Sequence, residues 1–321
     1  MKIFRADALK KVLVTGSEGF VGQHLVHLLK KDYSVIGLSR NTNLPNEENL
    51  TYVLGDILDS DQMFNLLKEN LPGAIIHLAG IAKTWGTDSK ELFNINLFGT
   101  LNIYEAIKKL KSMQSYNPKI LYISSAEVYG KTRNPEKITE DAPLLPINTY
   151  GTSKLAADRL SYQYSQSDHL QIAILRPFPH IGPGQAKGFF VPDMASQITE
   201  IEKNSGTEEI LTGNLESTRD YLDVRDVVQA YKAILENDFK PGEVFNICSG
   251  KGVLIKDLLD KMLKLAQKKV TVKEDPTRLR PVDLPVFVGS NEKLAQDIGW
   301  SPSFTIDQTL KDVLDYWRGK S

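Results

Sequence analysis

The chain has 321 residues, enough for a large core or for two domains, and its 41% hydrophobic and 25% charged residues are typical of a soluble globular protein. The formal net charge of −1 excludes an overall field that would favour nucleic acid or an anionic membrane as a partner. The single cysteine, Cys248, excludes a disulfide framework and a thiolate metal site, so we expect no metal. No apolar run reaches the length of a signal peptide or a membrane span, and we expect a cytoplasmic protein.

A glycine-rich turn follows the first predicted strand. Residues 11–15 are a short apolar run typical of a buried strand, and a helix is predicted after the turn, to about Lys31. Gly16, Gly19 and Gly22 allow tight turning and close backbone approach at a helix N-terminus, the arrangement that binds a pyrophosphate. The spacing is GxxGxxG rather than GxGxxG, so the turn alone is weak evidence for a dinucleotide site.

The end of the second predicted strand, residues 33–38, bears on the choice between NAD and NADP. An NAD-specific site usually places a carboxylate near this point, on the ribose 2′-hydroxyl. The residues that follow, Ser39, Arg40 and Asn41, offer no carboxylate, and Arg40 could bind a 2′-phosphate through two hydrogen bonds. The alternative is that Arg40 is an ordinary surface residue.

Strands and helices continue to alternate as far as Pro177, as a doubly wound parallel sheet requires. Small residues, Ala79 and Gly80, end the fourth strand and would let a cofactor approach, whereas His77 within that strand is expected to be structural. We predict strands over 51–57, 74–80, 119–123 and 171–175, helices to about 70, over 91–111 and from 150 to about 165, and a break of the sixth strand at residues 176–177.

Tyr150 and Lys154 are four residues apart on a predicted helix, so their side chains lie on one face. A neighbouring ammonium favours the phenolate, and we expect Lys154 to lower the pKa of Tyr150. Such a pair could exchange a proton with a carbonyl or an alcohol. An ordinary half-exposed tyrosine with a surface lysine is the alternative when the spacing is considered alone.

The alternation changes after Pro177, where turns, helices and short strands are interspersed. The predicted fold is therefore α/β, a Rossmann-type doubly wound parallel sheet with a smaller C-terminal α+β substrate lid. We predict a dinucleotide-binding domain over 1–178, which 219–247 rejoins, and a nucleotide-sugar-binding domain over 179–218 and 248–321.

In their order and spacing these motifs resemble the extended short-chain dehydrogenase/reductase family. The matching segments are Thr15-Gly16-x-x-Gly19-Phe20-x-Gly22, Asp56-Ile57, His77-Leu78-Ala79-Gly80, Asn96-x-x-Gly99-Thr100, Ser124-Ser125-x-x-Val128-Tyr129-Gly130 and Tyr150-x-x-x-Lys154. The resemblance implies a nicotinamide cofactor and a nucleotide-sugar substrate, with Ser125, Tyr150 and Lys154 as the catalytic set. It implies these cofactor-binding residues: Gly16, Gly19, Phe20, Val21, Gly22, Arg40, Asp56, Ile57, Leu78, Ala79, Tyr150, Lys154 and Pro177.

The C-terminal half is similar to the GDP-mannose 4,6-dehydratase group, on residues 180–185, 188–189, 213–220 and 279–283. The likeness is greatest to reductases of GDP-4-keto-6-deoxy-mannose, which form GDP-rhamnose. This implies NADPH as cofactor, with NADH possible, and a GDP-sugar as substrate. The implied substrate-binding residues are Ser125, Glu127, His180, Lys187, Arg219, Arg280 and Asp283.

Three departures from the family pattern bear on this interpretation. Pro179 stands where relatives often have Asn before the histidine, which leaves one sugar contact in doubt, and Ala79-Gly80 stands where two alanines are common. Ala126 stands where many sugar dehydratases have Asp before the glutamate, and this argues against a 4,6-dehydratase. A 4-epimerase that recycles its cofactor stays open, and a non-catalytic dinucleotide sensor is a remote alternative.

The resemblance also implies a homodimer, in which the helices predicted over 91–111 and 150–165 pack with their copies into a four-helix bundle. Leu92, Ile95, Phe98 and Leu155 are expected to supply the apolar surface.

Overall fold

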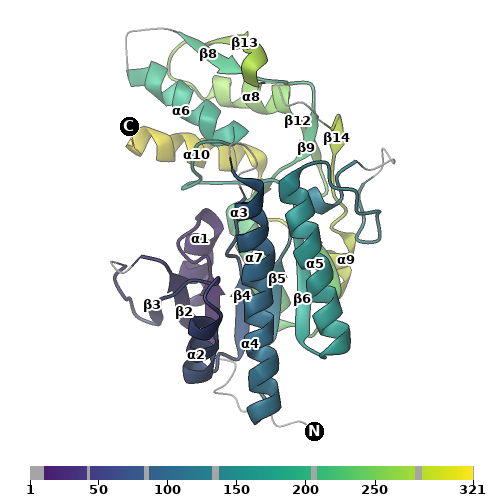
Figure 1. Ribbon diagram of the computed structural model, residues 1–321. Helices are drawn as coiled ribbons and strands as arrows, with labels where there is room; N and C mark the ends of the chain where they lie inside the picture. The colour runs from purple at the N-terminus through teal and green to yellow at the C-terminus, as the bar shows by residue number, and fades with distance from the viewer. Residues whose placement is uncertain are drawn as a thin grey trace. The chain divides into compact units, whose positions relative to one another are not determined.

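The computed structural model describes residues 11–41, 44–82, 87–131, 137–203, 208–278 and 284–320. The chain divides into two compact units, both visible in Figure 1. The first unit comprises Met1–Gly130, Ala142–Pro177 and Val228–Asn246, and the second comprises Lys131–Asp141, Phe178–Val227 and Ile247–Ser321.

A seven-stranded sheet forms the centre of the first unit, in the order β11-β6-β5-β4-β1-β2-β3. Strands β1 to β6 are joined by parallel pairings, which confirms the predicted Rossmann-type sheet. Its strands are β1 (Lys11–Thr15), β2 (Ser34–Ser39), β3 (Leu50–Leu54), β4 (Ala74–His77), β5 (Lys119–Ile123), β6 (Gln171–Pro177) and β11 (Glu243–Ile247).

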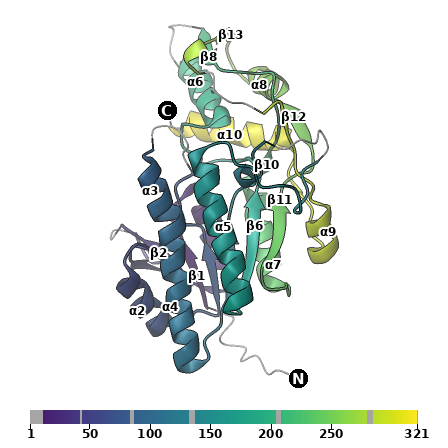
Figure 2. The ribbon, with the colours of Figure 1, turned by 45° about the vertical axis from the view of Figure 1, so that its right-hand side comes forward.

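Helices cover both faces of this sheet. In Figures 1 and 2, α2, α4 and α5 lie on one face, and α1 and α7 lie on the other. The helices are α1 (Phe20–Leu29), α2 (Ser60–Asn70), α3 (Ser89–Phe93), a π-helical turn (Asn94–Phe98), α4 (Gly99–Gln114), a 3-10 turn (Ala126–Val128), α5 (Thr149–Ser167) and α7 (Val224–Glu236).

Burial on both faces explains the apolar strands. Val12, Leu13 and Val14 of β1 are all fully buried, and Leu13 packs in one cluster with Ile103 and Ile107 of α4. A strand covered by helices on both sides has no polar face, so its sequence is a continuous apolar run.

Several predicted boundaries are wrong. The strands predicted over 51–57 and 74–80 end at Leu54 and His77. The helix predicted over 91–111 is three segments, because a π-helical turn separates α3 from α4. Strand β6 does not break at Arg176 but continues to Pro177. The guanidinium of Arg176 is fully buried there because Nε and Nη2 donate to the two carboxylate oxygens of Asp158, at 2.9 and 3.0 Å.

The second unit combines three longer helices with small sheets of two or three strands. Its core is an apolar cluster of α6, α8 and α10, including Met194, Leu259 and Leu314. Its elements are β7 (His180–Ile181), α6 (Phe190–Lys203), β8 (Glu209–Thr212), β9 (Thr218–Asp220), β10 (Leu222–Asp223), β12 (Gly252–Leu254), α8 (Ile255–Lys264), β13 (Thr271–Glu274), a 3-10 turn (Pro276–Arg278), β14 (Val286–Phe287), α9 (Glu292–Ile298) and α10 (Ile306–Lys320).

A buried carboxylate joins three segments of the second unit. Asp220, fully buried at the end of β9, accepts hydrogen bonds from the backbone N–H groups of Ser249, Gly250 and Gly289. Cys248 is buried beside them, as expected of a small core residue. Across the described ranges, no helix combines the length and the apolar character that crossing a membrane requires.

Candidate active site

The glycine-rich turn between β1 and α1 has the geometry that a dinucleotide requires. Gly16 has φ +70°, and a Cβ there would lie 2.7 Å from the backbone nitrogen of Ala79. A Cβ on Gly22 would lie 2.1 Å from the carbonyl oxygen of Gly16. Gly19 is the N-cap of α1 and provides no side-chain cap, and the first turn of α1 has no acidic residue. The first N–H groups of α1 therefore keep the capacity to bind a pyrophosphate.

The end of β2 differs from the prediction. Arg40 is exposed as expected, but the inference that no carboxylate is offered there is wrong. Glu18, in the glycine-rich turn, accepts hydrogen bonds from the Ser39 hydroxyl and from the backbone N–H of Arg40, the latter at 3.2 Å. The turn and the strand end meet in space although 22 positions separate Glu18 from Arg40, so a search of the residues after β2 alone missed this carboxylate.

The ends of β3 and β4 provide the other predicted cofactor positions. Asp56 accepts a hydrogen bond from the backbone N–H of Leu58 at 2.9 Å, and Ile57 is buried against α4. Leu78 and Ala79 follow β4 and are half-buried. These residues lie at the carboxyl edge of the parallel sheet, where open α/β sheets bind ligands.

His77 is a structural residue. Its ring nitrogens bond to the hydroxyls of Thr15 at 2.7 Å and Thr100 at 3.0 Å, which ties β4 to β1 and α4. Burial lowers the pKa of His77 to about 3, so the ring is neutral. This agrees with the structural role expected from the sequence.

Ser125, Tyr150 and Lys154 come together where β5 meets α5. Ser125 is almost fully buried at the start of the 3-10 turn, and its hydroxyl accepts from the backbone N–H of Glu127 at 3.1 Å. A side-chain hydrogen bond joins Ser125 and Tyr150, and it lowers the pKa of Tyr150. Burial acts in the opposite direction and more strongly, so the pKa of Tyr150 is raised to about 12. Tyr150 thus stays protonated at neutral pH.

Lys154 does not lower the pKa of Tyr150 in this structure, contrary to expectation. Its ammonium group is buried, donates to the carbonyl oxygen of Ile123 and lies 4.8 Å from the centre of the Tyr122 ring. Burial lowers the pKa of Lys154 to about 7, while the charge of Asp158 opposes that change. Because burial disfavours the charged form, Lys154 offers less positive charge to the phenol than an exposed lysine would.

Two asparagines hold α5 in position. Asn148, the N-cap, accepts from the backbone N–H of Gly151 at 2.7 Å and donates to the carboxylate of Glu127 at 3.0 Å. Asn96, in the π-helical turn, donates to the hydroxyl of Ser153 at 3.0 Å, and that hydroxyl donates to the carbonyl oxygen of Tyr150 at 2.8 Å. π-helical turns within α-helices often occur at functional sites, and here the turn supports the first turn of α5.

A buried ion pair lies close to the predicted catalytic residues. The Asp158 carboxylate, one turn after Lys154, bonds to Arg176 and accepts from the Ser124 hydroxyl at 2.9 Å. Arg176 also donates to the hydroxyl of Tyr129 at 3.0 Å. Neither Asp158 nor Arg176 was singled out from the sequence, although a charged residue at the end of an apolar strand is a signal for a buried partner.

The predicted substrate residues divide between the two units. Glu127 belongs to the first unit. In the second unit, Nδ1 of His180 donates to the carbonyl oxygen of Phe178 at 2.9 Å, and burial lowers the pKa of His180. Lys187 is exposed and pairs with Glu200 at 3.4 Å, and Arg219 donates to the carbonyl oxygens of Thr218 and Leu284. Arg280 and Asp283 lie outside the described residues.

Comparison with known proteins gives a family for the chain. The model of the family described as GDP-mannose 4,6 dehydratase matches residues 13–313. A GDP-6-deoxy-D-mannose reductase of Pseudomonas aeruginosa is 34% identical, over 97% of this chain and 98% of its own. A GDP-6-deoxy-D-talose 4-dehydrogenase of Aggregatibacter actinomycetemcomitans is 27% identical, over 92% of this chain and 93% of its own.

The fold is likewise shared with solved structures. The structure of RMD from Pseudomonas aeruginosa complexed with NADPH superposes with a TM-score of 0.81 and 32% identity, covering 97% of this chain and all of that chain. Nearly the whole length is therefore matched in both sequence and structure. The chain belongs to the GDP-mannose 4,6-dehydratase family.

Proposed function

We propose that the protein reduces the 4-keto group of GDP-4-keto-6-deoxy-D-mannose with NADPH and forms a GDP-6-deoxyhexose such as GDP-D-rhamnose. The hydrogen-bonded pair of Ser125 and Tyr150, with Lys154 one helical turn further on, carries this proposal. The reductase of Pseudomonas aeruginosa, matched over nearly the whole chain, supports the choice of substrate.

The glycine-rich turn fits a nicotinamide dinucleotide, since Gly16 and Gly22 leave no space for a side chain and the N-terminus of α1 has no side-chain cap. When bound, NADPH supplies the hydride for the keto carbon. The NADPH complex of the related structure supports NADPH as the cofactor. Arg40 is proposed as the partner of its 2′-phosphate. Tyr150, Lys154 and the residues at the ends of β3, β4 and β6 would complete the binding surface.

Three residues of the first unit have separate roles in the reduction. Tyr150 is protonated at neutral pH and donates its phenolic proton to the oxygen of the keto group as that oxygen becomes an alcohol. Ser125 donates a hydrogen bond to the same oxygen. Lys154 would hold a ribose hydroxyl of the cofactor.

We propose the following residues as contacts of the nucleotide sugar. Arg219 and Arg280 suit the diphosphate because a guanidinium binds phosphate through two hydrogen bonds, and Asp283 suits a ribose hydroxyl. Glu127, His180 and Lys187 are proposed as further contacts. The division into a dinucleotide-binding domain and a nucleotide-sugar-binding domain belongs to the same proposal.

A 4-epimerase is the nearest alternative, and a dehydratase is less well supported. Ala126 is almost fully buried and cannot act as an acid, and the carboxylate of Glu127 is bonded to Asn148. A non-catalytic sensor would have no need of the Ser125–Tyr150 pair. The names of the two relatives, a reductase and a dehydrogenase of GDP-6-deoxy sugars, favour net redox chemistry over epimerisation.

The proposal is tested by supplying GDP-4-keto-6-deoxy-D-mannose with NADPH, following absorbance at 340 nm and identifying the product by NMR. One NADPH consumed for each 4-hydroxyl product formed supports the reductase. A new sugar formed without consumption of NADPH supports the epimerase, and no reaction with any nucleotide sugar supports the sensor.

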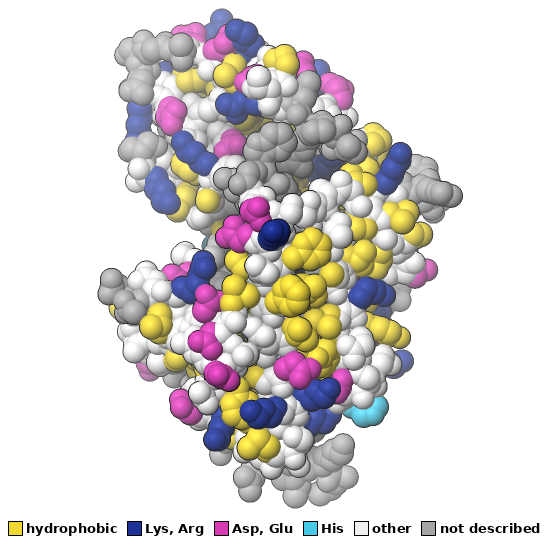
Figure 3. Space-filling model, in the orientation of Figure 1, with side chains coloured by type: hydrophobic (Ala, Val, Ile, Leu, Met, Phe, Trp, Pro, Cys, Tyr) yellow, Lys and Arg dark blue, Asp and Glu magenta, His cyan; other side chains and the backbone are white. Residues whose placement is uncertain are grey.

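We further propose a homodimer formed through α4 and α5. These helices lie side by side, joined by the hydroxyls of Tyr104 and Ser161 at 2.7 Å. In Figure 3 hydrophobic side chains gather over them, and Phe98, Met113 and Tyr162 are 49%, 60% and 46% exposed. Leu92, expected on this surface, is buried within the first unit, so that expectation is wrong.

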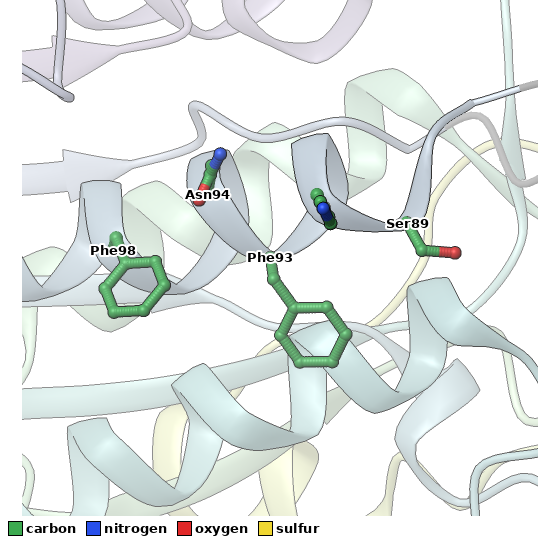
Figure 4. A pocket seen from close by; sticks show the side chains of 5 residues that line it. Ser89, Phe93, Asn94 and Phe98 are labelled. Atoms are coloured by element: carbon green, nitrogen blue, oxygen red, sulfur yellow. The ribbon is translucent and has the colours of Figure 1, made fainter.

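A pocket of about 360 Å³ adjoins this apolar surface, lined by Ser89, Lys90, Phe93, Asn94 and Phe98. Figure 4 shows the rings of Phe93 and Phe98 on the same side of their helical segment. We propose that the partner subunit covers them. A monomeric mass by light scattering at micromolar concentration would contradict the dimer. The expected cytoplasmic location stays a prediction.

A further inference from the structure

The Glu18 carboxylate is held at the end of β2 by the packing of the glycine-rich turn. The buried hydroxyl of Ser17 donates to the carbonyl oxygen of Leu38 at 2.9 Å and fixes the turn against the last residues of the strand. The next residue, Glu18, therefore reaches the Ser39 hydroxyl and the backbone N–H of Arg40. Its position follows from these contacts.

Among the described residues, no lysine or arginine forms an ion pair with the carboxylate of Glu18. Its contacts are a hydroxyl and a backbone N–H, and within the part of the chain that the structure describes neither Glu18 nor the guanidinium of exposed Arg40 has an ion-pair partner. Arg40 contacts Glu18 through its backbone and leaves the carboxylate charge in place. A half-buried charge of this kind acts on neighbouring groups more strongly than one in bulk water.

Glu18 also uses two of the hydrogen-bond donors that an anion would need at this position. The end of β2 is where a dinucleotide places the 2′ substituent of its adenosine ribose in folds of this type. A phosphate there would favour the Ser39 hydroxyl and the Arg40 N–H as donors, and both bond to Glu18. The guanidinium of Arg40 is left as the donor for a phosphate. A hydroxyl, by contrast, can donate to the carboxylate.

We propose that Glu18 is a specificity-determining residue for the cofactor: it opposes the 2′-phosphate of NADPH, accepts from the 2′-hydroxyl of NADH, and brings the two affinities close together. This inference rests on the proposed dinucleotide site. It extends the proposed function, since it makes NADH a second cofactor of comparable affinity and assigns the effect to a residue of the glycine-rich turn.

Binding of each cofactor to the purified full-length chain, measured by isothermal titration calorimetry without sugar substrate, tests the proposal. We expect the wild-type dissociation constants of NADPH and NADH to lie within about tenfold of each other, because Glu18 offsets Arg40. Glu18→Gln keeps the size and the acceptor oxygen but removes the charge. We expect it to tighten NADPH binding about tenfold while NADH changes less than about threefold.

Glu69→Gln, at an exposed position of α2, is the control for loss of one negative charge and should change neither constant. If Glu18→Gln does not yield folded protein, Glu18→Ser is measured in its place with the same expectation for NADPH.

Three results would overturn the proposal. In the first, the Glu18 variant leaves the NADPH constant unchanged or weaker while Arg40→Ala weakens it, which contradicts the role of Glu18 but retains the cofactor site. In the second, the wild type prefers NADPH by more than about a hundredfold, which contradicts comparable affinities for the two cofactors. In the third, the wild type binds neither cofactor, which overturns the proposed function as well.

Discussion

The two ends of the proposed cofactor site in the first unit are built differently. At the carboxyl end of β5, the proposed catalytic residues Ser125 and Lys154 are buried and Tyr150 is partly buried. Further buried side chains position them: Asn96, Asp158 and Arg176. At the end of β2, Arg40 is exposed and Glu18 half-buried, and only the short turn of residues 16–19 determines their positions. Many buried contacts fix the side chains at the first end, whereas a few contacts fix those at the second end.

This difference predicts how each end responds to substitution. A change in the buried network removes hydrogen bonds and leaves charges without partners in a medium of low dielectric constant, so its cost is large. A change at the exposed end alters screened interactions, so its effect is a moderate shift in cofactor preference. The four predictions below test this difference between the two ends.

Tyr150→Phe removes the proposed proton donor while keeping the ring. We expect turnover of the keto sugar to fall by roughly two to four orders of magnitude, the usual contribution of a general acid. Stopped-flow or initial-rate measurements at a saturating concentration of the substrate check this. Binding of NADPH should persist, and near-normal turnover in the variant would show that Tyr150 is not the acid.

Asp158→Asn leaves Arg176 buried without its carboxylate partner. We expect a loss of about 3–5 kcal/mol in the free energy of unfolding, the usual cost of breaking a buried ion pair on one side. Urea denaturation followed by circular dichroism measures it. Arg159→Ala is the matched control, because Arg159 bonds to the same carboxylate but is half-exposed, and its removal should cost less than about 1 kcal/mol.

Equal losses in the free energy of unfolding of those two variants would mean that burial does not make the Asp158–Arg176 contact more stabilising than the Asp158–Arg159 contact. The contrast between a buried and an exposed end would then lose its energetic basis.

Arg40→Ala removes the cation beside the proposed 2′-phosphate position. A hydrogen bond to a charged group contributes about 1.5–3 kcal/mol, so kcat/KM for NADPH should fall roughly tenfold to hundredfold. The value for NADH should stay nearly unchanged because NADH has no 2′-phosphate. Parallel rate measurements with both cofactors check this, and equal losses for the two would rule out a contact to the 2′-phosphate.

Lys154→Met tests the buried lysine through the pH dependence of stability. The pKa of Lys154 is lowered to about 7 in the folded chain. The ordinary pKa of a lysine side chain is ~10.4. Between pH 7 and this value the unfolded chain therefore binds more protons than the folded chain, and the free energy of unfolding rises with pH. Below pH 7 the folded chain carries the buried charge and the full penalty applies.

Replacing Lys154 by Met should therefore stabilise the cofactor-free chain more at pH 6 than at pH 10. We expect the gain in the free energy of unfolding to be about 4 kcal/mol larger at pH 6 than at pH 10, because each tenfold change in proton affinity corresponds to about 1.4 kcal/mol. Lys68→Met, at an exposed position of α2, should show no such difference. A larger gain at pH 10 would contradict the direction of the pKa change.

The sequence predicted the parts of the molecule that depend on local pattern. Apolar runs identified the strands of the sheet, because burial on both faces leaves no other composition possible. The spacing of Tyr150 and Lys154 placed both on one helix face, and the glycines of the first turn marked positions without space for a Cβ. These features can be inferred from neighbouring positions in the chain.

The remaining features depend on contacts between distant segments. Glu18 reaches the end of β2, and Arg176 stays in its strand because Asp158 lies opposite. The effect of Lys154 on Tyr150 was misjudged because burial, which spacing does not reveal, dominates both pKa values. Leu92 was placed on the surface because the π-helical turn, which changes the helix phase, was not foreseen.

Transfer of deuterium from NADPH labelled at C4 of the nicotinamide, on the transferred face, to the nucleotide sugar tests the central claim most directly. With GDP-4-keto-6-deoxy-D-mannose as substrate, NMR and mass spectrometry of the product locate the label. NADPH labelled on each face is used in separate reactions, and we expect one of the two preparations to place one deuterium at C4 of the sugar for every NADP⁺ formed. A product without deuterium from both preparations, or an altered sugar formed without net NADP⁺, would contradict the reductase and favour an epimerase.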